Sequence, residues 1–236
     1  MMIPAKVVNR LRPDRYLEFW LQRPRRALRA HVAVLRHPLL VPRLYFGVPG
    51  LVSPFSLALL WDTVMNSRSR SPNIVEVGAY KGLSTCCLTK AAARRNKLVW
   101  TFEWFQGLPP AQSELDSWVR AGSCKSDEAT WRENVARHGV LSRCRLVVGD
   151  ARNTIAGADI LTEEGFCVAF VDVDTYEVSA AVLEGLSRVI RGGETILVHD
   201  SYSPGVQKAV AEFVSSVGRP VRVVDYDNEI IRIAVE

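Results

Sequence analysis

The stretch of residues 74–82 reads Ile-Val-Glu-Val-Gly-Ala-Tyr-Lys-Gly, and it decides the fold class. Its first four residues form a short run rich in β-branched side chains, which is typical of a buried strand. Gly78 and Gly82 then allow a tight turn, and a helical pattern starts directly after the second glycine. A strand that passes into a helix through such a turn is typical of an α/β protein with a parallel sheet.

Short apolar runs alternate with helical patterns along the rest of the chain. This alternation predicts parallel strands that are covered by helices on both faces of a sheet. The chain ends with two short runs around a polar turn, which predict a terminal hairpin whose last strand is antiparallel. The predicted strands are 74–77, 99–103, 145–148, 168–173 and 195–199 with the hairpin 221–225 and 229–234, and the predicted helices are 82–95, 126–138, 176–190 and 203 to about 218.

The basic charge of the chain is concentrated before residue 50. The net charge is +5, and residues 1–45 contain ten Lys or Arg against two acidic residues. We therefore predict a basic, helical arm over residues 1–50, acting as a lid or an oligomer contact, and one catalytic domain over residues 51–236. Pro49 and Gly50 break the arm, and Ser53 with Pro54 predicts the start of an apolar helix that runs through residue 65.

The composition bounds the cellular setting. Of the 236 residues 48% are hydrophobic, which is enough for a sizeable core. No apolar run of about 18 residues and no secretory signal is evident, so we expect a cytoplasmic location. The five cysteines form no CxxC pair, which argues against a zinc or redox motif.

Polar residues follow three of the predicted strands, at the edge where open α/β sheets bind ligands. The glycine loop opens a helix whose N–H groups can bind an anion, and Glu103 can accept ribose hydroxyls. Asp150 can accept from a base amino group. A third glycine is absent, which argues against a dinucleotide, and a turn without ligand or a helix cap are the alternatives. The candidate cofactor-binding residues are Glu76, Gly78, Tyr80, Gly82, Ser84, Glu103, Trp104, Asp150, Ala151 and Asp172.

Two carboxylates stand at the carboxyl end of the predicted strand 168–173, and a histidine and a carboxylate stand at the same end of the next strand, 195–199. Asp172 and Asp174 would face the same side if the strand continued through both. Neighbouring strands lie about 4.8 Å apart, so Asp172 and Asp200 are expected to converge on one hard cation. Such an ion would bind an acceptor oxygen, and Asp174 or His199 would take its proton. The alternative for Asp174 is a helix N-cap.

Four segments resemble the macrocin O-methyltransferase family. They are residues 76–85, the Glu-Trp-Phe-Gln-Gly-Leu-Pro of 103–109, the Asp-Val-Asp-Thr-Tyr of 172–176, and residues 192–202, which end in His-Asp-Ser-Tyr. The resemblance covers about residues 50–236. It implies a Rossmann-like class I methyltransferase fold, with a seven-stranded, mostly parallel sheet, an antiparallel last strand and helices on both faces. It also implies methyl transfer from S-adenosyl-L-methionine to a sugar hydroxyl with the help of magnesium.

The resemblance carries specific roles to individual residues. Glu103 resembles the ribose-binding acid, Asp172 and Asp200 resemble metal ligands, and Asp174 resembles a candidate base. The family typically has two aspartates where this chain has His199 and Asp200, so the predicted metal ligands are Asp172, His199 and Asp200. Imidazole suits manganese, iron or zinc better than magnesium, which leaves the metal open. His199 is also a candidate base, or a strand-end histidine without a role in the chemistry.

Several alternatives stay open at this stage. A methyltransferase that works without metal, with Asp174 or His199 as base, is the first of them. A nicotinamide oxidoreductase and an RNA methylase are weaker, because the third glycine is absent and the arm's charges are not interleaved with aromatic residues. We expect a small sugar or glycoside acceptor, no nucleic-acid partner, a homo-oligomer, and peripheral contact of the arm with an anionic surface.

Overall fold

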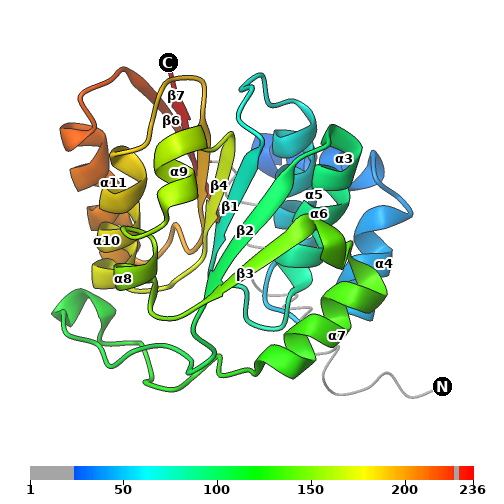
Figure 1. Ribbon diagram of the computed structural model, residues 1–236, viewed down its shortest axis with the longest axis horizontal. Helices are drawn as coiled ribbons and strands as arrows, with labels where there is room; N and C mark the ends of the chain where they lie inside the picture. Colours follow the sequence, from blue (N-terminus) through cyan, green and yellow to red (C-terminus); the bar gives the residue numbers. More distant parts are fainter. Residues whose placement is uncertain (1–23, 226–228) are drawn as a thin grey trace.

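A seven-stranded sheet forms the centre of the molecule in the computed structural model, which describes residues 24–225 and 229–236 (Figure 1). The strand order is β3-β2-β1-β4-β5-β7-β6. All neighbouring pairs from β3 to β5 are parallel, whereas β7 is antiparallel to both β5 and β6. The strands are β1 (Asn73–Val77), β2 (Leu98–Glu103), β3 (Cys144–Val148), β4 (Val168–Val171), β5 (Thr195–Val198), β6 (Val221–Asp225) and β7 (Ile231–Val235).

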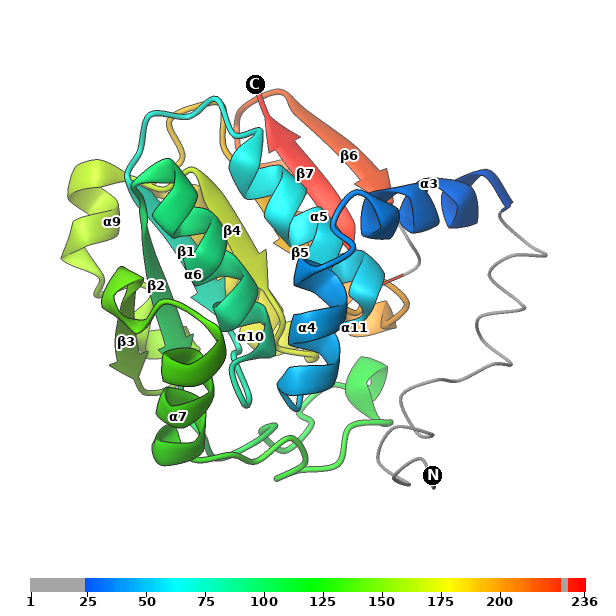
Figure 2. The same ribbon diagram turned by 90° about the vertical axis from the view of Figure 1, so that its right-hand side faces the viewer.

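Helices cover both faces of this sheet, and Figure 2 shows the two layers from the side. One hydrophobic core lies between the sheet and α3 to α7, and a second lies between the sheet and α8 to α11. The helices are α3 (Pro24–Leu35), α4 (Leu40–Gly47), α5 (Pro54–Met65), α6 (Leu83–Arg95), α7 (Glu128–His138), α8 (Ala151–Thr154), α9 (Asp159–Glu164), α10 (Tyr176–Ser187) and α11 (Pro204–Ser216), with 3-10 turns at Glu114–Asp116 and Leu141–Arg143. The mostly parallel sheet, the antiparallel β7 and the two helical layers are as the sequence predicted.

The described part of the predicted arm packs on the domain. In α4, Val41, Leu44 and Tyr45 are buried, and the arm's helices contact α5 and α6. α5 begins where the sequence predicts, because Ser53 accepts a hydrogen bond from the N–H of Ser56 and Pro54 occupies the first turn. The first 23 residues of the arm lie outside the described residues. None of the helices in the described part of the chain has the length and apolar character that a membrane crossing requires.

One strand boundary corrects the sequence prediction. β4 ends at Val171, so Asp172 and Asp174 do not continue a strand and do not share a face through strand pleating. Asp174 has a φ of +63°, in the left-handed region, and the chain turns there into α10. The side chain that caps α10 is not Asp174 either, because the N–H of Tyr176 donates to Asp116 Oδ2 at 2.8 Å. The strand prediction was wrong, although the two aspartates still approach each other.

Candidate active site

The glycine turn after β1 lies directly against the segment that follows β4. Gly78 has a φ of +84°, and a Cβ at this position would lie 1.9 Å from the carbonyl oxygen of Asp172. The N–H of Asp172 donates in turn to the carbonyl of Val77 at 2.8 Å. Only glycine fits this close approach. The turn therefore joins the predicted cofactor side of the site to the predicted metal side.

Glu103, at the end of β2, holds the turn together from the neighbouring strand. One carboxylate oxygen accepts the N–H groups of Ala79 and Tyr80, each at 2.8 Å. The other oxygen accepts the N–H groups of Trp104 and Phe105, also at 2.8 Å. Four backbone donors thus surround one carboxylate at the edge where ligands bind in this class of sheet. The predicted contact of Glu103 with ribose hydroxyls stays a prediction.

Glu76 lies beneath the turn and is completely buried. Its Oε2 accepts hydrogen bonds from the hydroxyls of Thr85 and Thr101, at 2.7 and 2.8 Å. Its Oε1 has no hydrogen-bond partner among the described residues. Burial raises the pKa of Glu76 to about 7, although the hydroxyl contacts act in the opposite direction. Glu76 therefore supports the turn from the core side, and its predicted contact with a cofactor stays a prediction.

The remaining predicted cofactor residues lie around this turn and at the end of β3. Ser84 is buried in the first turn of α6, Tyr80 is half-buried in the loop, and Trp104 donates its indole N–H to the carbonyl of Gly107 at 2.6 Å. Asp150 caps α8, and the guanidinium of Arg152 beside it lowers the pKa of its carboxyl group. Arg152 contacts both carboxylate oxygens of Asp150. The contact of Asp150 with a base amino group stays a prediction.

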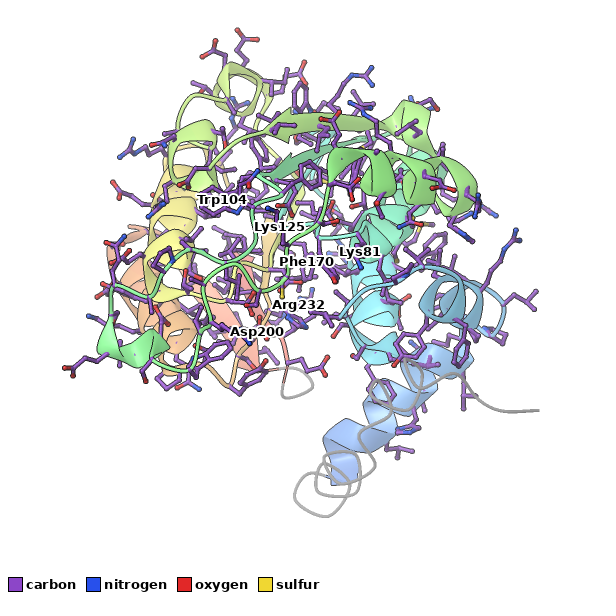
Figure 3. All side chains as sticks on the ribbon, turned by 90° about the horizontal axis from the view of Figure 1, so that it is seen from below. Lys81, Trp104, Lys125, Phe170, Asp200 and Arg232 are labelled. Carbon is purple, nitrogen blue, oxygen red and sulfur yellow. The ribbon has the colours of Figure 1, made fainter. Side chains whose placement is uncertain are left out.

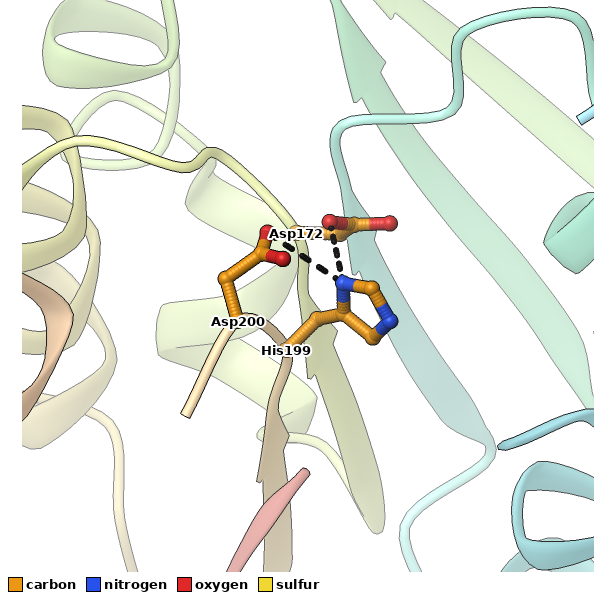
Figure 4. Close-up of side chains that lie close together, drawn as sticks. All are labelled: Asp172, His199 and Asp200. Carbon is orange, nitrogen blue, oxygen red and sulfur yellow. Dashed lines mark ion pairs between the residues drawn. The ribbon is translucent and has the colours of Figure 1, made fainter. Parts of the chain in front are cut away.

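The three predicted metal ligands lie together (Figure 4). Asp172 follows β4, whereas His199 and Asp200 follow the adjacent strand β5. One ligand atom from each lies within 4.8 Å of the others. His199 Nδ1 lies 3.0 Å from Asp172 Oδ1 and 3.2 Å from Asp200 Oδ2. The structure thus brings these residues to one point at the carboxyl edge of the sheet.

Charge and burial are opposed in this cluster. His199 is only 8% exposed, and neither ring nitrogen makes an aligned hydrogen bond to any described residue. Burial by itself would lower the pKa of His199, but the carboxylates of Asp172 and Asp200 raise it well above its usual range. Burial also disfavours the charged form of Asp172, and it therefore raises the pKa of this carboxyl group. The pKa of Asp200 is lowered despite burial, because His199 and the hydroxyl of Tyr202, which donates at 2.6 Å, stabilise its charge.

Asp174 belongs to the same group of carboxylates. Burial raises the pKa of Asp174 well above its usual range, and the charges of Asp200 and Asp172 act in the same direction. A carboxylate with a raised pKa accepts a proton more readily near neutral pH. The predicted role of Asp174 as a base stays a prediction.

Residues 104–127 form a loop across this edge, which Figure 3 views from below with Trp104, Lys125 and Asp200 labelled. Burial and the charges of Asp174, Asp172, Asp200 and Glu103 raise the pKa of Cys124 to about 11. This thiol thus lies within electrostatic reach of the carboxylates of both sides of the site. No pattern in the sequence marks Cys124 as a residue of the site.

Two further residues of the site were missed. Asp116, on the same loop, is 1% exposed and caps α10 directly after Asp174. Glu229 precedes β7 and places Oε2 at 3.8 Å from His199 Nε2. Both approach the site from distant parts of the chain, so no local sequence pattern could have revealed them.

Comparison with known proteins identifies the family. Residues 75–201 match the model of a methyltransferase domain, which is more than half of the chain. The chain belongs to this methyltransferase family. The matched segment begins in β1 and ends just after Asp200, so it contains the glycine turn, Glu103 and the whole Asp172–His199–Asp200 cluster. No curated protein sequence matches the chain significantly.

Solved structures show the same fold in other methyltransferases. The O-methyltransferase NovP has a TM-score of 0.68 at 21% identity, with 78% of this chain and 80% of NovP covered. The calicheamicin methyltransferase CalS11 has a TM-score of 0.59 at 17% identity, with 89% and 91% covered. An apo structure describes CalS11 as a TDP-rhamnose 3'-O-methyltransferase. The methyltransferase PaMTH1 of Podospora anserina, solved with SAH, has a TM-score of 0.58 at 17% identity, with 86% and 88% covered.

Proposed function

We propose that this methyltransferase transfers the methyl group of S-adenosyl-L-methionine to a hydroxyl of a sugar or glycosylated small molecule, with the help of a divalent metal. The observation that carries the proposal is the meeting of Asp172, His199 and Asp200 beside the glycine turn. The resemblance to macrocin O-methyltransferases and the sugar-modifying neighbour CalS11 support the acceptor class.

The donor side is assigned to the turn and its neighbours. Gly78 and Gly82 allow the backbone to approach a ligand closely, and α6 directs its N-terminal N–H groups toward the turn. Glu103 fixes the conformation of this loop through four backbone contacts. When bound here, S-adenosyl-L-methionine supplies a methyl group on a positively charged sulfur, which the surrounding carboxylates would favour.

The cluster fits a divalent cation. His199 is buried and its ring nitrogens lack aligned hydrogen bonds to the described residues, so its Nδ1 is left with two carboxylates at ion-pair distance. One imidazole and two carboxylates, with ligand atoms within 4.8 Å of one another, are a donor set that divalent transition ions accept. Asp172, His199 and Asp200 would hold such an ion, which would lower the pKa of an acceptor hydroxyl.

The chain's own residues complete the proton transfer. Asp174 has the raised pKa of a general base and lies beside Asp172 and Asp200. In this proposal a carboxylate oxygen of Asp174 accepts the proton of the acceptor hydroxyl. Asp116, on the loop 104–127, anchors that loop to α10 by accepting the N–H of Tyr176.

The second candidate is methyl transfer without a metal. It is favoured by the close ion pairs of His199, because a protonated imidazole already neutralises the carboxylates. In that case Asp174 acts as base by proximity alone. Removal of metal distinguishes the two candidates.

The proposal is tested with purified protein and a panel of glycosides. We expect binding of S-adenosylhomocysteine by calorimetry, formation of methylated product from S-adenosyl-L-methionine, and loss of turnover with a chelator that is restored by added metal. Turnover that is insensitive to chelator supports the second candidate. Absence of S-adenosylhomocysteine binding would overturn both.

A further inference from the structure

The two ring nitrogens of His199 face different carboxylates. Nδ1 faces Asp172 and Asp200 at 3.0 and 3.2 Å, whereas Nε2 faces Glu229 Oε2 at 3.8 Å. Glu229 enters from the start of β7, thirty residues after His199, and it stands outside the matched methyltransferase segment. The imidazole is therefore placed between a pair of aspartates on one side and a single glutamate on the other.

Glu229 is itself held in place. Its Oε2 accepts the hydroxyl of Ser56, on α5, at 2.9 Å, and its backbone carbonyl accepts the N–H of Ser201 at 3.0 Å. The ring of His199 also lies edge-on to Phe170, with 6.1 Å between ring centroids. These contacts, from α5, β4 and the segment after β5, restrict both the imidazole and the carboxylate behind it.

We propose that Glu229 is a positioning residue that keeps the proton of His199 on Nε2 and leaves Nδ1 as a ligand for a divalent transition metal. A histidine that binds a metal through one nitrogen characteristically donates its other N–H to a carboxylate, which fixes the tautomer and the ring orientation. The inference rests on the metal-assisted function proposed above and adds a residue that its motifs do not contain.

The donor set also selects a class of metal. One imidazole nitrogen with two carboxylates suits a transition ion, whereas magnesium prefers oxygen ligands throughout. An aspartate at position 199 would make the site all-oxygen and would have no ring proton for Glu229 to hold. In this proposal, Glu229 orients His199 so that the histidine serves as a metal ligand at this position.

Calorimetric titration of the full chain with Co²⁺ tests the inference. We expect Glu229→Ala to weaken Co²⁺ binding by roughly 10- to 100-fold, and Glu229→Gln to weaken it less, because an amide oxygen can also accept a proton from the ring N–H. Glu194→Gln is the matched control. Glu194 is a buried glutamate near the opposite end of β5 that accepts hydrogen bonds from the N–H groups of Arg191 and Gly192, and its change should leave Co²⁺ affinity unaltered.

A second titration, with Mg²⁺, tests the metal class. Wild-type protein should prefer Co²⁺ to Mg²⁺, and His199→Asp should reduce that preference at least about tenfold. S-adenosylhomocysteine affinity should be unchanged in the Glu229 variants, which reports that the fold and the donor side are intact. Equal Co²⁺ affinity of Glu229→Ala and wild type would overturn this inference alone. Failure of the wild-type protein to bind either metal would overturn it together with metal assistance.

Discussion

Two carboxylate sites lie at the same edge of the sheet, and they are satisfied in opposite ways. Glu103 is surrounded by four backbone N–H groups at 2.8 Å, from two loops that it joins. Asp172 and Asp200 face a single buried imidazole, which makes no aligned hydrogen bond to any described residue. The first site is complete within the protein, whereas the second is not.

This difference between the two sites indicates where a bound ligand would gain the most binding free energy. Buried polar groups that lack aligned partners cost free energy, and a cation that engages them recovers it. At Glu103 the backbone has already supplied the partners, so this corner forms a rigid frame for the donor loop. The site around Glu103 is thus preformed by the protein, whereas the Asp172–His199–Asp200 cluster is the site that a bound cation would complete.

Removing Asp172 should have the largest effect. Asp172→Ala takes a ligand from the cluster and should abolish turnover, since a bound metal contributes several kcal/mol of transition-state stabilisation, or about 10³-fold in rate. The fold should persist, as judged by the thermal midpoint. Asp127→Ala, which removes only an exposed cap of α7, is the control. Full activity of Asp172→Ala would contradict the metal scheme.

The contact between the two sites is tested by adding one methyl group. Gly78→Ala would place Cβ 1.9 Å from the carbonyl of Asp172, at a φ of +84°, and should reduce the free energy of unfolding by roughly 3 to 4 kcal/mol. Gly122→Ala has a similar φ of +75° but meets no atom within 4 Å, so it should cost only the backbone strain. Equal losses in urea unfolding would show that the clash is relieved at no cost.

The acid beneath the donor loop should give a pH-dependent stability. Burial raises the pKa of Glu76 from 4.5 to about 7, so the folded state binds more protons between these values and stability falls as pH rises through 7. The loss from this group between pH 5 and pH 8 is about 2 to 3 kcal/mol. Glu76→Gln should therefore show a flatter dependence in urea unfolding at these two pH values. Parallel profiles of variant and wild type would refute the assignment.

The smallest effect is expected from the preformed site. Glu103→Ala should weaken S-adenosylhomocysteine binding by roughly 1.5 to 3 kcal/mol, or about 10- to 100-fold. The reason is that the buried ribose hydroxyls would lose a charged acceptor. Glu103→Gln keeps one acceptor oxygen and should lose less. Unchanged affinity in calorimetry would show that the ribose lies elsewhere.

Most of the fold could be predicted from local patterns. The run of residues 74–77 with its glycine turn, the alternation of later runs and the terminal hairpin predict the sheet and its antiparallel β7 correctly. The end of β4 could not be predicted in this way. The Val-Asp-Val-Asp of residues 171–174 alternates like a strand, but the carbonyl of Asp172 packs on Gly78 and the chain leaves the sheet.

Local patterns also predicted part of the candidate site, namely the residues that stand at strand ends. Asp172 and His199 lie at the carboxyl ends of predicted strands and Asp200 directly follows one, and parallel neighbours bring these ends to one edge. Asp116 lies in the loop 104–127 and Glu229 lies just before β7, where no periodicity marks them. Their approach to α10 and to His199 depends on how separate segments pack.

The sequence by itself determined which strands are buried, where the chain turns and which acids stand at strand ends, because these follow from short-range patterns of size and polarity. Only the tertiary structure decided that Glu103 is enclosed by backbone donors while His199 is enclosed by three acids. Such partnerships join residues far apart in the chain, and the packing of whole layers fixes their distances.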